Sequence, residues 1–368
     1  MLFRSNTSFP SHDIKKMEKG EIVEYIFMDT LKDETRPIEK VDAGKTRVFG
    51  AAPMDFIIVF RMYYLDFLVY MMRNRILNES AVGIKAQSNE WTFLYNKLRK
   101  NGAQVIAGDF SNYDGTLHPE ILWSIFDIIQ QYYWKEGSTP AEDNVRYCLW
   151  HNLVNSYHIC GNWFYQLNHS QPSGNPSTAI LNSMYNSIAC RYTFYNIYAP
   201  NINFNDYVSM IAYGDDNVLN ISPCVPEFTQ ERMAKEFEQI GMIYTDESKS
   251  LNLCYKTLSE VTFLKRGFSF DTNSHFCFSP LVLPSILEAF NWIKKTDNEV
   301  TIIQQIAENS LVELSMHPKD VFNHYARLIY QVCAQEYNID INILSYASYR
   351  TKIKTGQIFD THPTIDWI

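Results

Sequence analysis

Residues 207–221 read Tyr-Val-Ser-Met-Ile-Ala-Tyr-Gly-Asp-Asp-Asn-Val-Leu-Asn-Ile, two β-rich apolar runs on either side of a Gly-Asp-Asp turn. This pattern predicts a β-hairpin with Asp215 and Asp216 at its tip. Two adjacent carboxylates on a tight turn repel each other unless a cation or a basic side chain neutralises them. Gly-Asp-Asp is an ordinary turn sequence, so the signal is its placement between two hydrophobic strands rather than the tripeptide itself.

A second acidic segment, Asp109-Phe-Ser-Asn-Tyr-Asp114, ends the apolar run at 103–109, which predicts a strand. A side chain at the end of a strand can project from the sheet edge into a cleft. The alternative is an Asp-rich turn that leads into a helix. Together, Asp109 and Asp215 would supply one carboxylate from each of two neighbouring strands. That is the minimum for holding two metal ions about 3.5–4 Å apart, and Mg²⁺ prefers such oxygen ligands.

A third segment is the loop Gln171-Pro-Ser-Gly-Asn-Pro-Ser-Thr178, followed by a predicted helix with an apolar stripe over 180–192. Gly174 permits a sharp backbone turn. Thr178 and Asn182 are four residues apart and therefore share one helix face, where two short hydrogen-bonding side chains could bind a sugar hydroxyl. The alternative is a capped helix with a polar stripe.

A basic run near the N-terminus has five cations within sixteen positions: Lys32, Arg36, Lys40, Lys45 and Arg47. They could form a phosphate-binding strip. Four acids are interleaved with them, so the alternative is a solvated loop whose charges pair with one another. Farther along the chain, Lys249 and the segment 263–267 could donate a proton to a leaving group or simply balance charge.

The remaining pattern predicts further elements and excludes some classes. The run 56–72 contains Arg61 and Asp66, which favours a buried helix over a membrane span. Helices are expected over 91–99, from Pro119, over 227–240 and through most of 284–348, and strands around 251–253 and 261–270.

Composition excludes other classes. The net charge of −9 rules out a uniformly basic nucleic-acid coat, so any polyanion site must be local. Seven scattered cysteines without a C-x-x-C pair argue against a disulfide scaffold or structural zinc. The N-terminus has no apolar stretch typical of a signal peptide, so a cytoplasmic location is expected.

With these segments in this order, the chain resembles the RNA-dependent RNA polymerases of picorna-like positive-strand RNA viruses. The resemblance covers residues 30–270, and the helical remainder suits the family's thumb. The Ser-Gly-Asn-Pro sequence in the third segment is similar to the insect-virus and calicivirus-like branches. The segments resemble the polymerase motifs as follows: 109–114 motif A, 173–182 motif B, 213–216 motif C, Lys249 the motif D lysine, 263–266 motif E and 32–47 motif F.

The resemblance implies an α+β right-hand fold with fingers, a palm built on an antiparallel sheet, and a helical thumb. Family members carry a substantial stretch before motif F, so part of the N-terminal fingers is expected to be missing. The expected boundaries are 1–66 for partial fingers, 67–116 for palm, 117–176 for fingers, 177–270 for palm and 271–368 for thumb.

The implied activity is template-directed RNA synthesis from nucleoside triphosphates, in viral genome replication and transcription. Asp109 and Asp215 would bind two Mg²⁺ ions, for which Mn²⁺ can substitute, with Asp216 in a secondary role. Lys249 would protonate the departing pyrophosphate. The implied partners are template and product RNA, a genome-linked protein primer and other viral replication proteins, in membrane-associated replication complexes of the host cytoplasm.

The resemblance also assigns the binding residues. Ribose recognition is expected from Asp114, Ser173, Gly174, Thr178 and Asn182. Triphosphate binding is expected from Lys32, Arg36, Lys40, Lys45 and Arg47, and primer or RNA binding from Lys265 and Arg266.

Two alternatives belong to other classes. A reverse transcriptase typically carries Tyr-x-Asp-Asp and a bulky residue against the 2′-position, whereas Asp114 and Asn182 are polar. A non-catalytic, truncated RNA-binding fragment is the other. Retention of both Asp109 and Asp215 argues against it.

Overall fold

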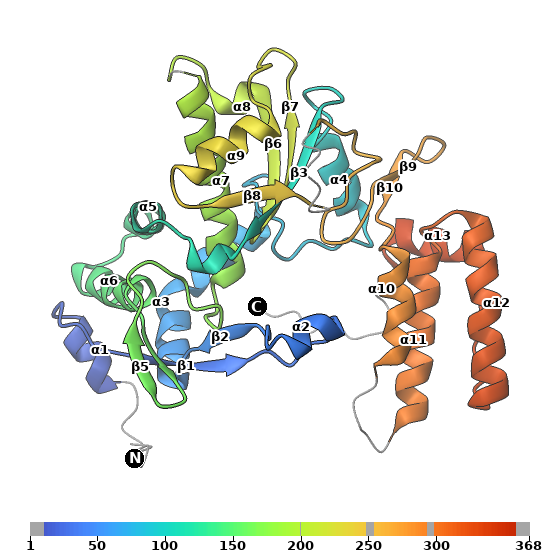
Figure 1. The fold of residues 1–368 in the computed structure, drawn as a ribbon, viewed down its shortest axis with the longest axis horizontal. Coiled ribbons are helices and arrows are strands. Elements are labelled where there is room, and N and C mark those ends of the chain that lie inside the picture. Colours follow the sequence, from blue (N-terminus) through green and yellow to red (C-terminus); the bar gives the residue numbers. More distant parts are fainter. Residues whose placement is uncertain (1–10, 199, 248–253, 293–297, 358–368) are drawn as a thin grey trace.

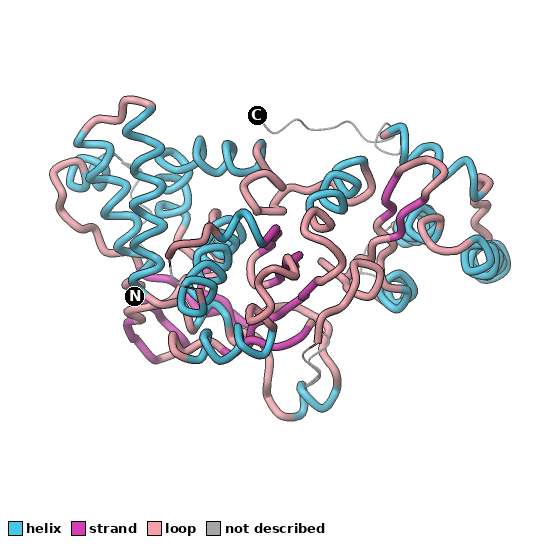
Figure 2. The backbone as a smooth tube through the Cα atoms, turned by 90° about the horizontal axis from the view of Figure 1, so that it is seen from above, coloured by secondary structure: helices cyan, strands magenta, loops and turns pink. Residues whose placement is uncertain are grey.

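The computed structural model describes residues 11–198, 200–247, 254–292 and 298–357. A central sheet lies between a second sheet with its helices and a C-terminal helical unit (Figure 1). Seen from above, helices gather at the two ends of the molecule and the central strands lie between them (Figure 2).

The central sheet has the strand order β6-β7-β3-β8, and every neighbouring pair is antiparallel. The predicted hairpin is its β6–β7 unit, which joins Val208–Tyr213 to Asp216–Ile221. The other two strands are β3 (Val105–Ser111) and β8 (Ile243–Asp246).

Both faces of this sheet are covered, which explains why its strands are apolar nearly throughout. Helices α7 (Thr178–Ile197) and α9 (Gln230–Glu238) pack on the face that carries Ile106, Phe110 and Met210. Helix α4 (Asn89–Lys97) covers the face that carries Val105, Ala107, Ile211 and Val218. Because side chains alternate along a strand, Asp109 and Asp216 lie on the α4 face, beyond the part that α4 covers.

The second sheet has the order β2-β1-β4-β5, with β1 and β4 parallel and the other pairs antiparallel. Long helices pack beside it, and α3 is the buried helix that the run 56–72 predicts. The elements of this region are α1 (Ser11–Met17), β1 (Ile26–Leu31), α2 (Ile38–Asp42), β2 (Val48–Ala51), α3 (Met54–Arg73), η1 (Tyr113–Gly115), α5 (Pro119–Lys135), α6 (Pro140–Val154), β4 (Tyr157–Cys160) and β5 (Trp163–Gln166).

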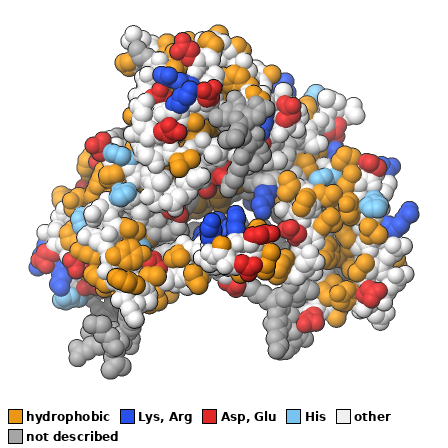
Figure 3. Space-filling model, viewed as in Figure 1, with side chains coloured by type: hydrophobic (Ala, Val, Ile, Leu, Met, Phe, Trp, Pro, Cys, Tyr) orange, Lys and Arg blue, Asp and Glu red, His pale blue; other side chains and the backbone are white. Residues whose placement is uncertain are grey.

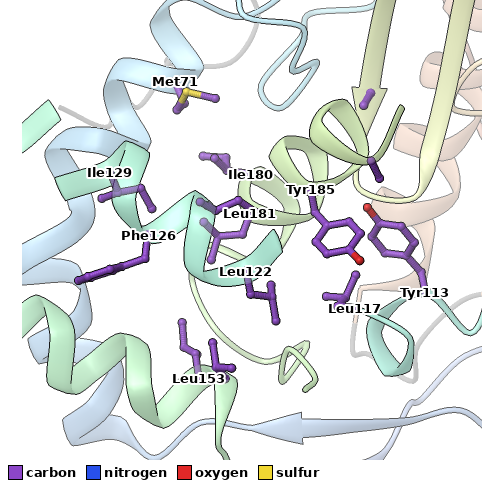
Figure 4. Close-up of a cluster of buried hydrophobic side chains, with 14 of the residues drawn as sticks. Met71, Tyr113, Leu117, Leu122, Phe126, Ile129, Leu153, Ile180, Leu181 and Tyr185 are labelled. Carbon is purple, nitrogen blue, oxygen red and sulfur yellow. The ribbon is translucent and has the colours of Figure 1, made fainter. Parts of the chain in front are cut away.

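One hydrophobic cluster joins this region to the central sheet. It brings together Met71 of α3, Ile129 of α5, Leu153 of α6 and Leu181 of α7, all buried (Figure 4). Helix α7 therefore contacts the central sheet with one face and the helices beside the second sheet with another, and it sets the relative position of their polar residues.

The C-terminal unit is helical, as expected, and has its own apolar core that includes Leu311, Phe322 and Ile329. A short β-hairpin precedes it. The elements are β9 (Ser269–Asp271), β10 (Phe276–Phe278), α10 (Leu283–Glu288), η2 (Ala289–Asn291), α11 (Glu299–Leu314), α12 (Lys319–Glu336) and α13 (Tyr346–Thr355). The remaining helix, α8 (Phe204–Tyr207), belongs to the central region, where it directly precedes β6.

Some expectations need correction. The strand expected over 261–270 is wrong for most of its length, because a tight turn at Phe263–Arg266 interrupts it and β9 begins only at Ser269. The strand expected at 251–253 lies outside the described residues. In the described part of the chain, no helix has both the length and the apolar character needed to cross a bilayer.

Candidate active site

Three carboxylates meet where the two central strands of the sheet end. The β3–β7 register runs from Val105 opposite Asn220 to Gly108 opposite Asn217. One residue farther along, the same register sets Asp109 opposite Asp216 on one face, where directly opposed side chains are about 4.5–5.5 Å apart at Cβ. Asp215 precedes Asp216 in the turn. The prediction that the two acidic segments lie on neighbouring strands is confirmed, and their joint role in metal binding stays a prediction.

Helix α7 holds the turn in place through two side chains that sequence reasoning missed. The backbone N–H of Gly214 donates to Ser183 Oγ at 2.9 Å. Asn186 Nδ2 donates to the carbonyl oxygens of Gly214 and Asp215, both at 3.1 Å. Gly214 has φ = +63°, a left-handed conformation that glycine adopts at low cost. The turn is therefore anchored by its backbone, which leaves its carboxylates available.

A buried polar chain continues this anchor beneath the sheet. Asn217 Nδ2 donates to Asn186 Oδ1 at 3.2 Å, and the Tyr244 hydroxyl donates to Asn217 Oδ1 at 2.8 Å. Tyr244 lies so close to Gly108 that a Cβ there would meet its hydroxyl oxygen at 2.0 Å. Glycine at 108 is thus a packing requirement. The sequence signal for this hydrogen-bonded network was the pair Ser183 and Asn186, which are three residues apart and therefore share one helix face.

Burial and neighbouring negative charges govern the electrostatics of the turn. Partial loss of water contact, with the charges of Asp109 and Asp114, raises the pKa of Asp215, although its side chain still reaches solvent. Burial and the charges of Asp215, Asp109 and Glu247 raise the pKa of Asp216 to about 7. Both shifts mean that the surroundings disfavour the ionised form of these two carboxyl groups.

This donor set fits Mg²⁺, which takes a few carboxylate oxygens from protein and completes its shell with phosphates and water. Within the described residues, no three His, Cys, Asp or Glu side chains already converge as a preformed metal centre. The lack of a preformed centre is compatible with Mg²⁺ binding, because phosphates and water supply the remaining ligands in a site of this kind.

A second cluster of polar side chains adjoins the turn. Asp114, in η1, accepts a hydrogen bond from Asn182 Nδ2 at 2.7 Å through Oδ1 and one from Ser173 Oγ through Oδ2. The predicted neighbourhood of Asp114 and Asn182 is confirmed. Asn182 Oδ1 is buried and has no hydrogen-bond partner among the described residues. Since a buried amide oxygen is costly to leave unpaired, it is a natural acceptor for a ligand hydroxyl.

Thr178 does not join this cluster. Its hydroxyl donates to carbonyl oxygens of its own loop, to Ser173 at 3.1 Å and Asn175 at 2.9 Å. Closing the loop therefore engages the hydroxyl as a donor, and the sugar contact of Thr178 stays a prediction. Thr178 supports the backbone around Ser173.

Gly174 brings the loop against the second sheet. Its N–H donates to the carbonyl of Gly50 at 3.0 Å, and a Cβ at 174 would lie 2.5 Å from that oxygen. Only glycine permits this approach. The loop before α7 is thus tied to β2, directly after the basic run.

The basic run is partly neutralised by its own acids. Arg47 forms a bidentate pair with Glu34 at 2.9 and 2.7 Å, and Arg36 approaches the same carboxylate at 3.2 Å. The hydrogen bond from Arg47 lowers the pKa of Glu34. Lys40 and Lys45 are exposed and form no ion pair within the part of the chain that is described. Lys and Arg side chains around α2 face the hollow beneath the central sheet (Figure 3).

A family model described as viral RNA-dependent RNA polymerase matches residues 9–334. This chain belongs to that family. It is 39% identical over 352 residues to the replicase polyprotein of Acute bee paralysis virus, covering 91% of this chain and 18% of the polyprotein. It is 38% identical over 352 residues to the replicase polyprotein of Drosophila C virus, covering 91% of this chain and 20% of that one. The chain therefore spans about a fifth of the length of these relatives.

The fold agrees with this membership. A solved structure, the Sicinivirus 3Dpol RNA dependent RNA polymerase, superposes with a TM-score of 0.75 at 21% identity, over 93% of this chain and 70% of that one. The predicted picorna-like family and the α+β right-hand class are confirmed. The expected domain boundaries remain predictions.

For this polymerase-family chain, Lys265 and Arg266, the residues predicted to bind primer or RNA, lie in the tight turn at Phe263–Arg266. Leu264 and Lys265 form the centre of the turn, with φ of +54° and +58°. The guanidinium of Arg266 binds Glu313 of α11 at 2.8 and 2.7 Å and the Ser279 carbonyl at 2.9 Å, and its role in RNA binding stays a prediction. Arg266 therefore joins the central region to the helical unit, and Lys265 stays exposed at the tip.

Lys249 lies outside the described residues. Seven residues later in the sequence, Lys256 Nζ binds Asp246 at 2.6 Å and Glu247 at 3.2 Å. Glu247 was not anticipated from the sequence, yet its charge acts on Asp216. The candidate active site therefore has a further carboxylate on the far side of the sheet from the ribose cluster.

Proposed function

We propose that this chain carries out template-directed RNA synthesis by transferring nucleotidyl groups from nucleoside triphosphates to an RNA 3′ end, in viral genome replication and transcription. The observation that carries the proposal is the turn at Gly214–Asp216, which lies beside Asp109 of the neighbouring strand, so that burial and the charge of Asp109 raise the pKa of both its carboxyl groups. Family membership supports the same reaction class.

Asp109 and Asp215 would hold two Mg²⁺ ions, or Mn²⁺ in their place, with Asp216 in a supporting role. Such ions lower the pKa of a hydroxyl and stabilise charge on the transferring phosphoryl group. In this reaction the 3′ oxygen forms a bond to the α-phosphorus as the bond to pyrophosphate breaks. Lys249 is the predicted donor of the proton that pyrophosphate takes.

The ribose cluster would orient the incoming nucleotide. Asp114 fixes the Asn182 amide through its N–H, so the unpartnered Oδ1 is left to accept a hydrogen bond from a sugar hydroxyl. Ser173 ties the adjoining loop to Asp114, and the N–H of Gly174 ties it to Gly50 of β2. This polar arrangement favours an RNA polymerase over a reverse transcriptase, because a hydroxyl-binding site discriminates against the analogue that lacks the hydroxyl.

The basic run supplies the counterpart for the triphosphate. The basic residues outside the Glu34 pairs would approach the triphosphate directly: Lys32, Lys40 and Lys45. Arg36 and Arg47 would bind the triphosphate in competition with Glu34, which already pairs with both. Template and product RNA, a genome-linked protein primer and other replication proteins are the proposed partners. The proposed location is the membrane-associated replication complex of the host cytoplasm.

The test is primer extension on a homopolymeric template with Mg²⁺, comparing the wild type with Asp215→Asn. Asparagine keeps the size of the side chain and removes the charge that holds the cation, so incorporation should be abolished while thermal unfolding is unchanged. Asp206→Asn, an exposed carboxylate in α8, is the matched control. Incorporation by Asp215→Asn within tenfold of wild type would contradict the metal assignment.

A non-catalytic RNA-binding fragment is the alternative. It predicts that this chain binds RNA without extending the primer. Extension by this chain excludes the alternative, whereas extension only by a version lengthened at the N-terminus supports it.

A further inference from the structure

A cavity of about 720 Å³ lies behind the central sheet, between α4, the C-terminal end of α3 and the beginning of β6. None of the residues assigned above to the candidate active site lines it. It reaches β6 at Val208 and Ser209, at the opposite end of that strand from the turn. Five residues of β-strand separate the two ends, about 17 Å at 3.3–3.4 Å per residue.

The cavity is lined by more cations than anions. Arg73, Arg75, Lys97 and Lys100 face it, against Glu79 and Glu90. Both carboxylates are already engaged, because Glu90 binds Arg75 and Glu79 binds Arg191 at 2.8 Å from outside the lining. In the described ranges Arg73 and Lys100 form no ion pair. The cavity therefore carries positive charge that nothing described in the chain neutralises.

Lys97, at the cavity's inner wall, is another cation that the described residues do not neutralise. Its ammonium donates to the backbone carbonyl of Ile76 and forms no ion pair among the described residues. Burial lowers the pKa of Lys97 to about 8, which Glu79 opposes and Arg191 reinforces. A group with a depressed ammonium pKa gains stability when an anion enters its surroundings.

One wall of the cavity is apolar and open. Phe93 of α4 is 57% exposed and Leu77 is 84% exposed, and both line the same space. An exposed aromatic ring beside cations suits a nucleobase, because base–aromatic stacking is favourable for every base. The volume lies within the range of small-ligand sites, about 300–1,000 Å³.

The wall is held rigidly without a ligand. Glu79 adopts φ = +66°, its carbonyl accepts the Ala212 N–H at 2.8 Å, and its carboxylate binds Arg191. Strain of this kind persists only where several contacts determine the conformation. The cavity is thus a preformed site.

We propose that this cavity binds a nucleoside phosphate, with the base against Phe93 and the phosphates on Arg73, Lys97 and Lys100. The site is separate from the polymerisation centre and does not depend on the function proposed above. Combining an aromatic wall with cations favours a nucleotide over inorganic phosphate, which would use only the cations. An RNA strand is the competing occupant that the test must separate.

The first experiment measures GTP binding to the full chain by isothermal titration calorimetry without divalent cations. The Arg73→Glu/Lys100→Glu variant should lose one GTP site, or bind it at least tenfold more weakly. Lys135→Glu/Lys319→Glu, two exposed lysines elsewhere with the same charge change, should match wild type. Equal site number and affinity in the first variant and wild type would overturn the proposal.

The second experiment separates the base from the phosphates. Phe93→Ala should weaken GTP binding at this site several-fold and leave inorganic triphosphate binding unchanged. An azido-ATP photoprobe should label the 89–97 helix in wild type and much less in the charge-reversed variant. Triphosphate binding as tight as GTP, or displacement of GTP by a ten-nucleotide RNA at a far lower concentration, would overturn the nucleotide assignment.

Discussion

The Gly214–Asp216 turn and the basic run carry opposite charges, and the chain stabilises them in opposite ways. The turn at Gly214–Asp216 is fixed by buried Asn186, which is 0% exposed, and its carboxylates have raised pKa values. The basic run is largely exposed, and the single carboxylate of Glu34 within it pairs with two of its guanidinium groups. The turn is rigid and its carboxylates repel one another, whereas the basic run is exposed and part of its positive charge is paired with Glu34.

The difference shows where each region gets its shape. The backbone geometry of the turn comes from neutral amides and a hydroxyl, so its charge is left for a ligand. The basic run gets part of its geometry from its own charges, so ligand binding there must compete with Glu34. Changes to the turn should therefore have large effects and changes to the run small ones.

The largest effect should come from breaking the anchor of the turn. Asn186→Ala removes the donor to the Gly214 and Asp215 carbonyls and leaves Asn217 Nδ2 without its acceptor. Unpaired buried groups cost about 1–3 kcal/mol each, so we expect about 2–4 kcal/mol of lost stability. Incorporation should also need more Mg²⁺. Urea unfolding and an Mg²⁺ titration of primer extension check this.

Asn196→Ala, farther along the same helix, is the control for that comparison, because it binds Glu236 rather than the turn. An unchanged Mg²⁺ requirement in Asn186→Ala would mean that the turn keeps its shape without the helix.

The next effect concerns sugar selection. Asn182→Ala removes the unpartnered oxygen beside Asp114 and should lower discrimination between ATP and dATP by about 1–3 kcal/mol. The measurement is the ratio of kcat/KM for the two nucleotides. Asn186→Ala should lower both rates and leave the ratio intact. If the ratio is the same in Asn182→Ala and wild type, Asn182 is a packing residue.

A smaller effect follows from the charge of the turn. Because the pKa of Asp216 is about 7, above its ordinary value of 3.8, metal-free folded protein keeps a proton that the unfolded chain releases. Asp216 therefore leaves the free energy of unfolding unchanged below pH 4, lowers it as the pH rises toward 7, and keeps it lowered above pH 7.

Asp216→Asn should therefore raise the stability of the metal-free protein at pH 8 by about 1–2 kcal/mol, after allowance for solvent screening. The gain should vanish near pH 4. Thermal unfolding between pH 4 and 8 tests both statements, and a gain independent of pH would refute the electrostatic explanation.

The smallest effect should come from the basic run. Glu34→Gln releases Arg36 and Arg47, and should lower the KM for nucleoside triphosphates about two- to fivefold at low salt. The gain should fade at high salt, because exposed charges are screened. Glu39→Gln, an exposed acid in the same loop, should change neither. A raised KM would show that Glu34 organises the run for binding.

Much of the fold could be predicted from patterns local in the chain. The hairpin around Gly214, the helix from Pro119 and the helix over the stripe at 180–192 follow from two- and 3.6-residue periods. The segment at 261–270 could not, because Leu264 and Lys265 adopt a left-handed conformation that their residue types disfavour. Its tertiary neighbours, among them the Pro280 and Ser279 carbonyls, impose that turn.

By itself, the sequence determined which chemistry this protein can hold: the carboxylates at 109, 215 and 216, the polar loop before α7 and the basic run are all legible as residue types at fixed spacings. Only the tertiary structure decided how those groups are used. It paired Asp114 with Asn182, turned Thr178 back onto its own loop, joined Arg266 to Glu313 and placed Asn186 under the turn. The physical reason is that a side chain's hydrogen-bonding capacity is set by its type, whereas its partner is set by which distant segment packing brings within about 3 Å.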